Sequence, residues 1–132
     1  LVKPIKDSFD SRERPINLDR SNIVWLDANK SNKVEKGAEI SYLWKQNNLE
    51  GSLIKLPKGY KGIIKSNGSV FHAIVIQGQP IYNIPNDANS KTLDPGSYFT
   101  SNGTSSHFIV SDKTQETLIY IRTNGDLSIK AQ

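Results

Sequence analysis

Residues 56–85 read LPKGYKGIIKSNGSVFHAIVIQGQPIYNIP, and residues 93–107 read LDPGSYFTSNGTSSH. The first segment predicts a glycine-containing loop at 58–69 that leads into a strand at Val70–Gln77, which Gly78 ends. Because this strand is apolar at consecutive positions, we expect it to be buried on both faces. The second segment predicts two tight turns around a short strand, followed by a histidine.

The rest of the chain repeats this pattern of short apolar segments separated by turn residues. No window shows a sustained period of 3.6 residues, so we expect little or no helix. Asn124–Gly125 predicts a hairpin between the last two strands. The strands predicted are 22–28, 40–44, 52–56, 70–77, 81–84, 97–100, 107–111, 116–123 and 127–130. This spacing predicts an all-β sandwich or barrel, and a jelly roll uses about this number of strands.

Length and charge limit the classes of function. A chain of 132 residues forms one domain, and we assign residues 1–21 to an irregular N-terminal arm or linker and 22–132 to the domain. The net charge of +4 is small and dispersed, so we expect no nucleic-acid partner, and no apolar run is long enough to span a membrane. Lys55, Lys58, Lys61 and Lys65 fit either a phosphate-binding stripe or a solvated loop, and we favour the loop.

The chain contains neither cysteine nor methionine. Without cysteine, disulfides and thiolate metal sites are excluded. Without an initiator methionine, Leu1 is expected to follow a cut, made by signal-peptide removal, by proteolysis or at the boundary of an expressed segment. A periplasmic or secreted location is our expectation, with the cytoplasm as the alternative.

Two motifs with fixed spacing then relate the chain to a known family. Cupins carry Gly, five residues, His-x-His, three or four residues, Glu, six residues and Gly, and a second motif that contains one histidine. The spacing fits here from Gly59 to Gly78, and His107 falls at the histidine of the second motif. The chain therefore resembles the cupin superfamily. It is similar to a subgroup of bacterial cupins that are often exported and often built of two repeats, and to the cupin domain of zinc-binding anti-sigma factors.

The resemblance implies a jelly-roll β-barrel whose metal ligands are mostly replaced. Lys65 and Asn67 stand where the two histidines of the first motif would be, and Phe71 stands where the glutamate would be. An ammonium repels a divalent cation and a phenyl ring donates nothing to it. We therefore expect no metal ligands and no cofactor. His72 is out of phase with Phe71 and is expected to face away from the site.

The candidate ligand-binding residues are those that the motif would bring to the barrel mouth. For Lys65 the alternatives are a cation that receives an anionic ligand and a solvated loop lysine, and for His107 they are a pocket residue and a hydrogen-bonded core histidine. No catalytic group can be named. The residues predicted at the mouth are Lys65, Asn67, Phe71, Tyr98 and His107.

Three functions are compatible with this pattern. We favour a non-enzymatic domain that binds a small molecule, with an anion as one version. The alternatives are a cupin enzyme of the isomerase, lyase or oxygenase type, with or without metal, and a structural repeat of a two-cupin protein. The partner is then a small molecule or a second cupin repeat. We also expect a homodimer, because Val70, His72, Ile74 and Ile76 form an apolar phase that must be covered.

Overall fold

The fold consists of two antiparallel β-sheets. In a computed structural model, which describes residues 23–83 and 89–132, ten strands form two sheets of five strands each. The strands are β1 (Glu39–Gln46), β2 (Leu49–Leu56), β3 (Lys61–Ser66), β4 (Phe71–Gln77), β5 (Ile81–Asn83), β6 (Ser90–Thr92), β7 (Tyr98–Ser101), β8 (Ser105–Val110), β9 (Thr117–Thr123) and β10 (Leu127–Ala131).

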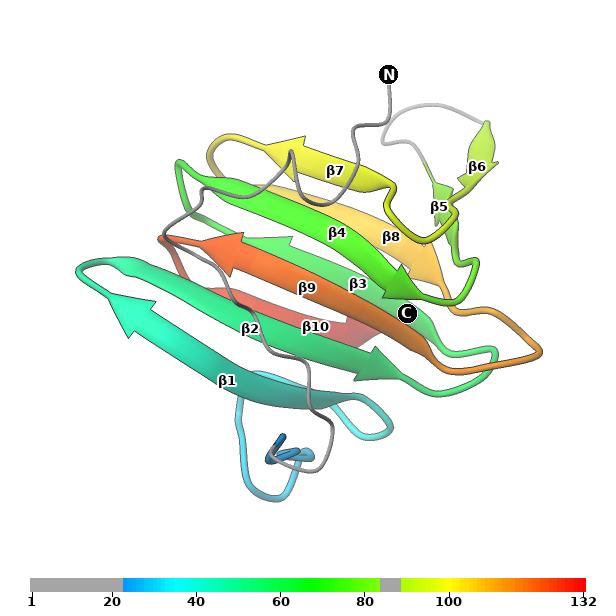
Figure 1. The fold of residues 1–132 in the computed structure, drawn as a ribbon, viewed down its shortest axis with the longest axis horizontal. Helices are drawn as coiled ribbons and strands as arrows, with labels where there is room; N and C mark the ends of the chain where they lie inside the picture. The colour runs from blue at the N-terminus through cyan, green and yellow to red at the C-terminus, as the bar shows by residue number, and fades with distance from the viewer. Residues whose placement is uncertain (1–22, 84–88) are drawn as a thin grey trace.

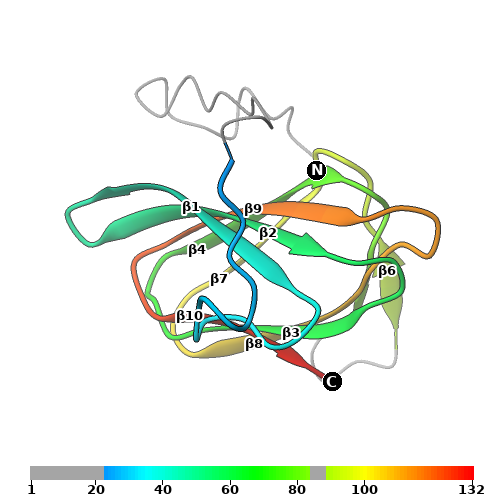
Figure 2. The same cartoon turned by 90° about the horizontal axis from the view of Figure 1, so that it is seen from below.

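The first sheet has the order β1-β2-β9-β4-β7 and the second has the order β10-β3-β8-β5-β6. Figure 1 looks onto the first sheet, with the second sheet behind it, and Figure 2 shows the two sheets as stacked layers. From β2 onward the chain passes repeatedly from one sheet to the other, and only β1–β2 and β5–β6 are neighbours in both sequence and sheet. This arrangement confirms the predicted all-β jelly roll.

The core lies between the sheets because each strand turns alternate side chains inward. In β4, for example, Phe71, Ala73 and Val75 are fully buried and belong to the core. The buried apolar core is made of Val34, Ala38, Ile40, Ile54, Leu56, Ile64, Phe71, Ala73, Val75, Leu93, Phe99, Ile109, Ile119, Ile121, Leu127 and Ile129. Polar residues can therefore reach the interior only at those alternate positions of each strand that point inward.

Most of the predicted strands are present, but three segments differ. One is β6, Ser90–Thr92, whose residues are polar and exposed and were not predicted as a strand. The predicted loop 58–69 contains β3, whose alternation of exposed and buried residues is a strand pattern that the flanking glycines obscured. Segment 23–28 forms only an isolated bridge, Leu26 to Ile40, because Asp27 starts a turn in which it accepts a hydrogen bond from the backbone of Asn29. The expected arm 1–21 and most of the turn 85–90 lie outside the described residues.

The last two strands do not form the hairpin that Asn124–Gly125 predicted. β9 lies in the first sheet and β10 pairs with β3 in the second, so this turn carries the chain across the sandwich. The dipeptide was correctly assigned to a turn, but a turn does not decide whether the flanking strands pair. No helix in the described part of the chain has the length and apolar character needed to cross a membrane.

Four apolar side chains on the outer face of the first sheet are already buried within one chain. Leu53, Ile74, Leu118 and Tyr120 point away from the core cluster and are at most 5% exposed. The expectation of a homodimer rested on an uncovered apolar phase of β4. Of that phase, Ile74 is 4% exposed without a partner, Val70 and Ile76 are half-buried and His72 is exposed, so the phase does not by itself require a second copy.

Candidate functional site

His107 is the one histidine that reaches the interior of the sandwich. It lies on β8 between Ser105 and Ile109, which share its face of the strand, and its side chain is 3% exposed. Across the sandwich its ring packs against residues of β4 and β7, and within its own sheet it contacts β5. The site therefore draws on four strands and both sheets.

Both ring nitrogens of His107 have hydroxyl partners. Tyr82 Oη lies 2.8 Å from Nδ1 and Ser101 Oγ lies 3.0 Å from Nε2. Ser105 Oγ is 3.4 Å from Nε2 and 2.8 Å from Ser101 Oγ. A neutral imidazole donates at one nitrogen and accepts at the other, so the hydroxyls satisfy it fully. Ser101 and Ser105 remain partly exposed, and they link the buried ring to the surface.

Aromatic rings form the walls around the imidazole. The Phe71 ring is stacked on it, with centroids 4.8 Å apart and planes 11° apart. The rings of Phe99 and Tyr82 lie 5.1 and 5.8 Å from it. We call this set the His107 cluster; it contains Phe71, Tyr82, Phe99, Ser101, Ser105 and His107.

Burial keeps the cluster uncharged at neutral pH. Desolvation lowers the pKa of His107 below its ordinary value, because the imidazolium loses hydration that the hydroxyls and rings do not replace. Desolvation also raises the pKa of Tyr82, so its phenol stays protonated. The cluster therefore offers neutral hydrogen-bonding groups enclosed by apolar rings.

The residues that face inward around His107 do not fit a transition metal. Ile64 is its cross-strand partner on β3, Ser66 is paired with Ser105, and Phe71 occupies the position facing its ring. None of these three supplies an imidazole, thiolate or carboxylate. The described residues contain no group of three or more His, Cys, Asp or Glu side chains that could hold a metal ion. Among residues 23–83 and 89–132, the side chains around His107 therefore do not form the ligand set of a cupin metal site.

Two of the predicted mouth residues do not reach the interior of the barrel. The cupin motif spacing implied that residues 65 and 67 face inward, whereas β3 turns residues 62, 64 and 66 inward. Gly62, Ile64 and Ser66 are the buried residues of this strand, and Lys65 is exposed on the opposite face from His107. Asn67 is exposed and accepts a hydrogen bond from the Asp126 backbone nitrogen at 2.7 Å. A shift of one residue along a strand moves a side chain to the other face, so a cationic cup built on Lys65 is not formed.

Tyr98 and His72 also lie outside the interior of the barrel. Tyr98 is 38% exposed and is paired with Ile74 on the outer face of the first sheet, away from the His107 cluster. His72 is exposed, as expected from its phase relative to Phe71. Of the five predicted residues, only Phe71 and His107 are brought together.

Sequence reasoning missed the groups that complete the site. Ser105 shares the face of His107 because it lies two residues before it on β8, and this spacing was visible in the sequence. Ser101 is the last residue of β7, just before the turn at 102–104 that leads into β8. Tyr82 and Phe99 carried no local signal, because their proximity depends on how the two sheets pack.

The connections beside the cluster interlock. Asn124 Oδ1 accepts a hydrogen bond from the Val70 backbone, and Gly103 donates its backbone N–H to Gly68 O at 2.8 Å. Gly68 and Gly125 pack so closely that a methyl group on Gly125 would meet the Gly68 nitrogen at 2.4 Å. We call these two connections the glycine clasp: residues 67–70 and 124–126.

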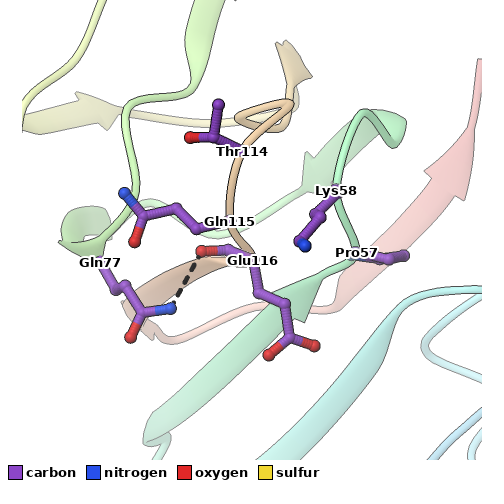
Figure 3. Close-up of a pocket in the computed structure, with 6 residues that line it drawn as sticks. All are labelled: Pro57, Lys58, Gln77, Thr114, Gln115 and Glu116. Carbon is purple, nitrogen blue, oxygen red and sulfur yellow. Dashed lines mark hydrogen bonds between the residues drawn. The ribbon is translucent and has the colours of Figure 1, made fainter.

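The opposite end of the barrel carries an open hollow of about 660 Å³. Figure 3 shows its lining, in which Gln77 Nε2 donates to the backbone oxygen of Glu116 at 3.1 Å. The other lining residues are Pro57, Lys58, Thr114 and Gln115. This hollow is wide, shallow and remote from His107, so its size does not make it the better candidate.

The geometry now defines the class of protein, because solved cupin structures share this fold. An RmlC-like cupin from Shewanella frigidimarina aligns with a TM-score of 0.62 and 17% identity over 80% of this chain and 86% of that one. KdgF from Halomonas sp. aligns with a TM-score of 0.60 and 18% identity over 76% and 87%. The Rhodobacter sphaeroides SigE complex with the anti-sigma factor ChrR contains a chain that aligns with a TM-score of 0.61 and 13% identity, over 78% and 49%.

The protein is therefore a cupin-fold protein. A family model described as a domain of unknown function, DUF4437, matches residues 1–130, and the chain belongs to that family. The comparison with curated proteins gives no match. At these identities the solved structures establish the fold, and the site must be interpreted from this chain's own residues.

Proposed function

We propose that this cupin domain binds a small neutral molecule at the His107 cluster, without a metal ion and without catalysing a reaction. The observation that carries the proposal is a buried, uncharged imidazole with hydroxyl partners at both nitrogens and aromatic rings around it. Binding sites of this kind combine apolar walls with a few precisely placed polar groups.

The chemistry of the cluster favours a ligand with one hydroxyl, carbonyl or amide group on an apolar body. Ser101 and Ser105 are the partly exposed members of the hydrogen-bonded chain, so an incoming polar group meets them first. Either hydroxyl can donate or accept. The rings of Phe71 and Phe99 then supply contact for the apolar part of the ligand.

An anionic ligand, which the sequence allowed, is disfavoured by this geometry. Lys65 lies on the outer face, and burial lowers the pKa of His107, so it carries no charge at neutral pH. A carboxylate buried among neutral hydroxyls and phenyl rings lacks the cation that would offset its desolvation.

Metal independence and the absence of catalysis are parts of the same proposal. Ile64, Ser66 and Phe71 provide no metal-ligating set. The titratable members of the cluster are one imidazole and one phenol, and burial raises the pKa of that phenol, which does not favour proton transfer at neutral pH. A cupin enzyme and a structural repeat of a two-cupin protein remain the alternative functions.

The proposal is tested by thermal shift and calorimetry with a defined panel of probes. Benzyl alcohol, cyclohexanone and benzamide represent the neutral class, and benzoate is the charged match of benzyl alcohol. We expect saturable stabilisation by at least one neutral probe, weaker stabilisation by benzoate, and a loss of binding of about tenfold in Ser101→Ala. Ser128→Ala, on the outer face of β10, is the matched control and should bind normally.

The alternatives give distinct results in the same experiment. Equimolar Fe, Mn, Zn or Ni in the purified protein, lost in His107→Gln, would replace the proposal with a metal-dependent cupin. A complete absence of binding by the neutral probes would favour the structural-repeat alternative. Equal binding of benzoate and benzyl alcohol, unaffected by Ser101→Ala, would move the site away from His107.

A further inference from the structure

The outer face of the second sheet combines lysines with exposed apolar side chains. Register places Lys130, Ile63 and Phe108 side by side across β10, β3 and β8. In the next row Lys61 lies beside Val110, which lies beside Ile81 of β5. We call this surface the lysine–apolar face; its residues are Lys61, Ile63, Lys65, Ile81, Phe108, Val110 and Lys130.

The apolar part of this face is open to solvent. Phe108 is 37% exposed and Ile81 is 38% exposed, which makes them two of the most exposed large apolar residues of the described chain. Ile63 and Val110 are half-buried between them. Contiguous exposed apolar side chains with a polar rim are typical of an interaction surface.

The charge of the face has one sign. Lys61, Lys65 and Lys130 are all exposed, and no described carboxylate forms an ion pair with any of them. The other outward positions of the described strands of the second sheet carry serine, threonine or asparagine, namely Asn83, Ser90, Thr92, Ser106 and Ser128. A partner that approaches this face therefore meets three lysines with no ion pair to a described carboxylate, beside an apolar strip.

These features select among four kinds of partner. A second copy docked through the same face would bring six ammonium groups together. Single-stranded nucleic acid favours several stacking rings, and Phe108 is the only ring among the described outward residues of the second sheet. A lipid surface favours protruding apolar side chains, whereas those here are at most 38% exposed. A protein segment with carboxylates along one side and apolar residues along the other matches both halves of the face.

We infer that the lysine–apolar face docks an acidic amphipathic segment of another protein. Its carboxylates lie against Lys61, Lys65 and Lys130, and its apolar side chains cover Ile63, Phe108, Val110 and Ile81. The face belongs to the opposite side of the second sheet from His107, so this interaction is separate from the proposed ligand site. Two of the four lysines that the sequence grouped together, Lys61 and Lys65, contribute to it.

The test uses a synthetic peptide in fluorescence anisotropy with the intact protein. The probe is a fluorescein-labelled amphipathic helix of about five turns, with leucine on one face and glutamate beside it. Its matched peptides are a scrambled sequence and a version with lysine in place of glutamate. We expect saturable binding of the acidic amphipathic probe alone, and weaker binding as salt is raised.

Paired variants locate the binding surface. Lys65→Glu with Lys130→Glu should weaken binding by about tenfold or more, and Phe108→Ser should weaken it similarly. Lys30→Glu with Lys113→Glu makes the same change in net charge at exposed positions elsewhere, and Tyr42→Ser removes an exposed ring that is 47% accessible. These controls should bind like the wild type, and circular dichroism verifies that every variant is folded.

Several results would overturn the inference. Failure of the acidic amphipathic probe to bind saturably, or equal binding by the scrambled peptide, would remove the docking surface. Binding that survives the Lys65 and Lys130 reversals would place it elsewhere. Tighter binding to phosphatidylserine–phosphatidylcholine vesicles or to an oligothymidine strand would reassign the face to a lipid surface or to nucleic acid.

Discussion

At the scale of single residues, His107 determines what the interior of this protein can bind. Its two nitrogens are held by Tyr82 and Ser101, and Phe71 is stacked on its ring. These neighbours are all neutral, so protonation of the ring gains no ionic partner and loses hydration. A buried neutral histidine of this kind links the free energy of unfolding to pH.

The first prediction concerns that linkage. The pKa of His107 is lowered in the folded state, so below about pH 6.5, the ordinary histidine pKa, the unfolded chain binds more protons. Stability from this group is therefore fully present above about pH 6.5 and is lost as the pH falls below it. Urea unfolding at about pH 8 and pH 5 should show a larger loss for wild type than for His107→Gln.

His72→Gln is the matched control for this measurement, because His72 is exposed on β4. This control should lose stability with falling pH as the wild type does. An identical pH dependence of wild type and His107→Gln would show that burial does not disfavour the imidazolium.

The second prediction concerns Asp112, in the connection between β8 and β9. Its carboxylate accepts hydrogen bonds from the backbone and hydroxyl of Thr114 and from the backbone of Gln79. These bonds favour the charged form and lower the pKa of Asp112 to about 2. A carboxyl NMR titration should show this value in the wild type and a higher one in Thr114→Ala. Thr104→Ala is the control. If it raised the pKa of Asp112 as much as Thr114→Ala does, the Thr114 hydrogen bonds would not be the cause of the low pKa.

At the scale of elements, the phase of β3 separates the predicted site from the observed one. Spacing in the sequence placed Lys65 and Asn67 at the barrel mouth, but the strand buries Ile64 and Ser66. Lys61 and Lys65 are four residues apart and share one face of the strand, opposite Ile64 and Ser66, so the sequence already contained this phase. The partners of His107 on β5 and β7 depend on packing between sheets, and no local pattern in the sequence encodes that packing.

The third prediction concerns the glycine clasp. An alanine at Gly125 would place its methyl carbon 2.4 Å from Asn67 Oδ1 and 2.5 Å from Gly68 Cα. Overpacking of this kind costs about 1–3 kcal/mol, so Gly125→Ala should lower the free energy of unfolding in urea by about that amount. Ser128→Ala, on the outer face of the neighbouring β10, should change it by less than about 0.5 kcal/mol. Equal stability of the two variants would show that the two connections do not interlock.

At the scale of the whole molecule, the sequence predicted the architecture better than the pairing of strands. Short apolar segments and turn residues indicated two packed sheets, and this is the observed arrangement. Asn124–Gly125 predicted a hairpin, yet β9 and β10 lie in different sheets. A turn dipeptide specifies a change of direction, whereas sheet membership is decided by which apolar faces meet across the core.

The fourth prediction concerns the oligomeric state. Leu53, Ile74, Leu118 and Tyr120 on the outer face of the first sheet are buried within one chain, and the lysines of the second sheet repel a second copy. We therefore expect a monomer by light scattering at micromolar concentration. A stable dimer that persists in Lys65→Glu with Lys130→Glu would show that a surface of the first sheet, such as that around Tyr98, mediates self-association.

The central claim is that His107 forms part of a neutral ligand site that does not depend on metal. Nitrogen NMR of the histidine side chains, recorded during titration with benzyl alcohol and separately with Zn²⁺, tests it most directly. We expect saturable shifts of the His107 ring nitrogens with the alcohol, little change at His72, and no stoichiometric Zn²⁺ coordination by His107. Equimolar Zn²⁺ coordination at His107, or a ring that does not respond to the alcohol, would contradict it.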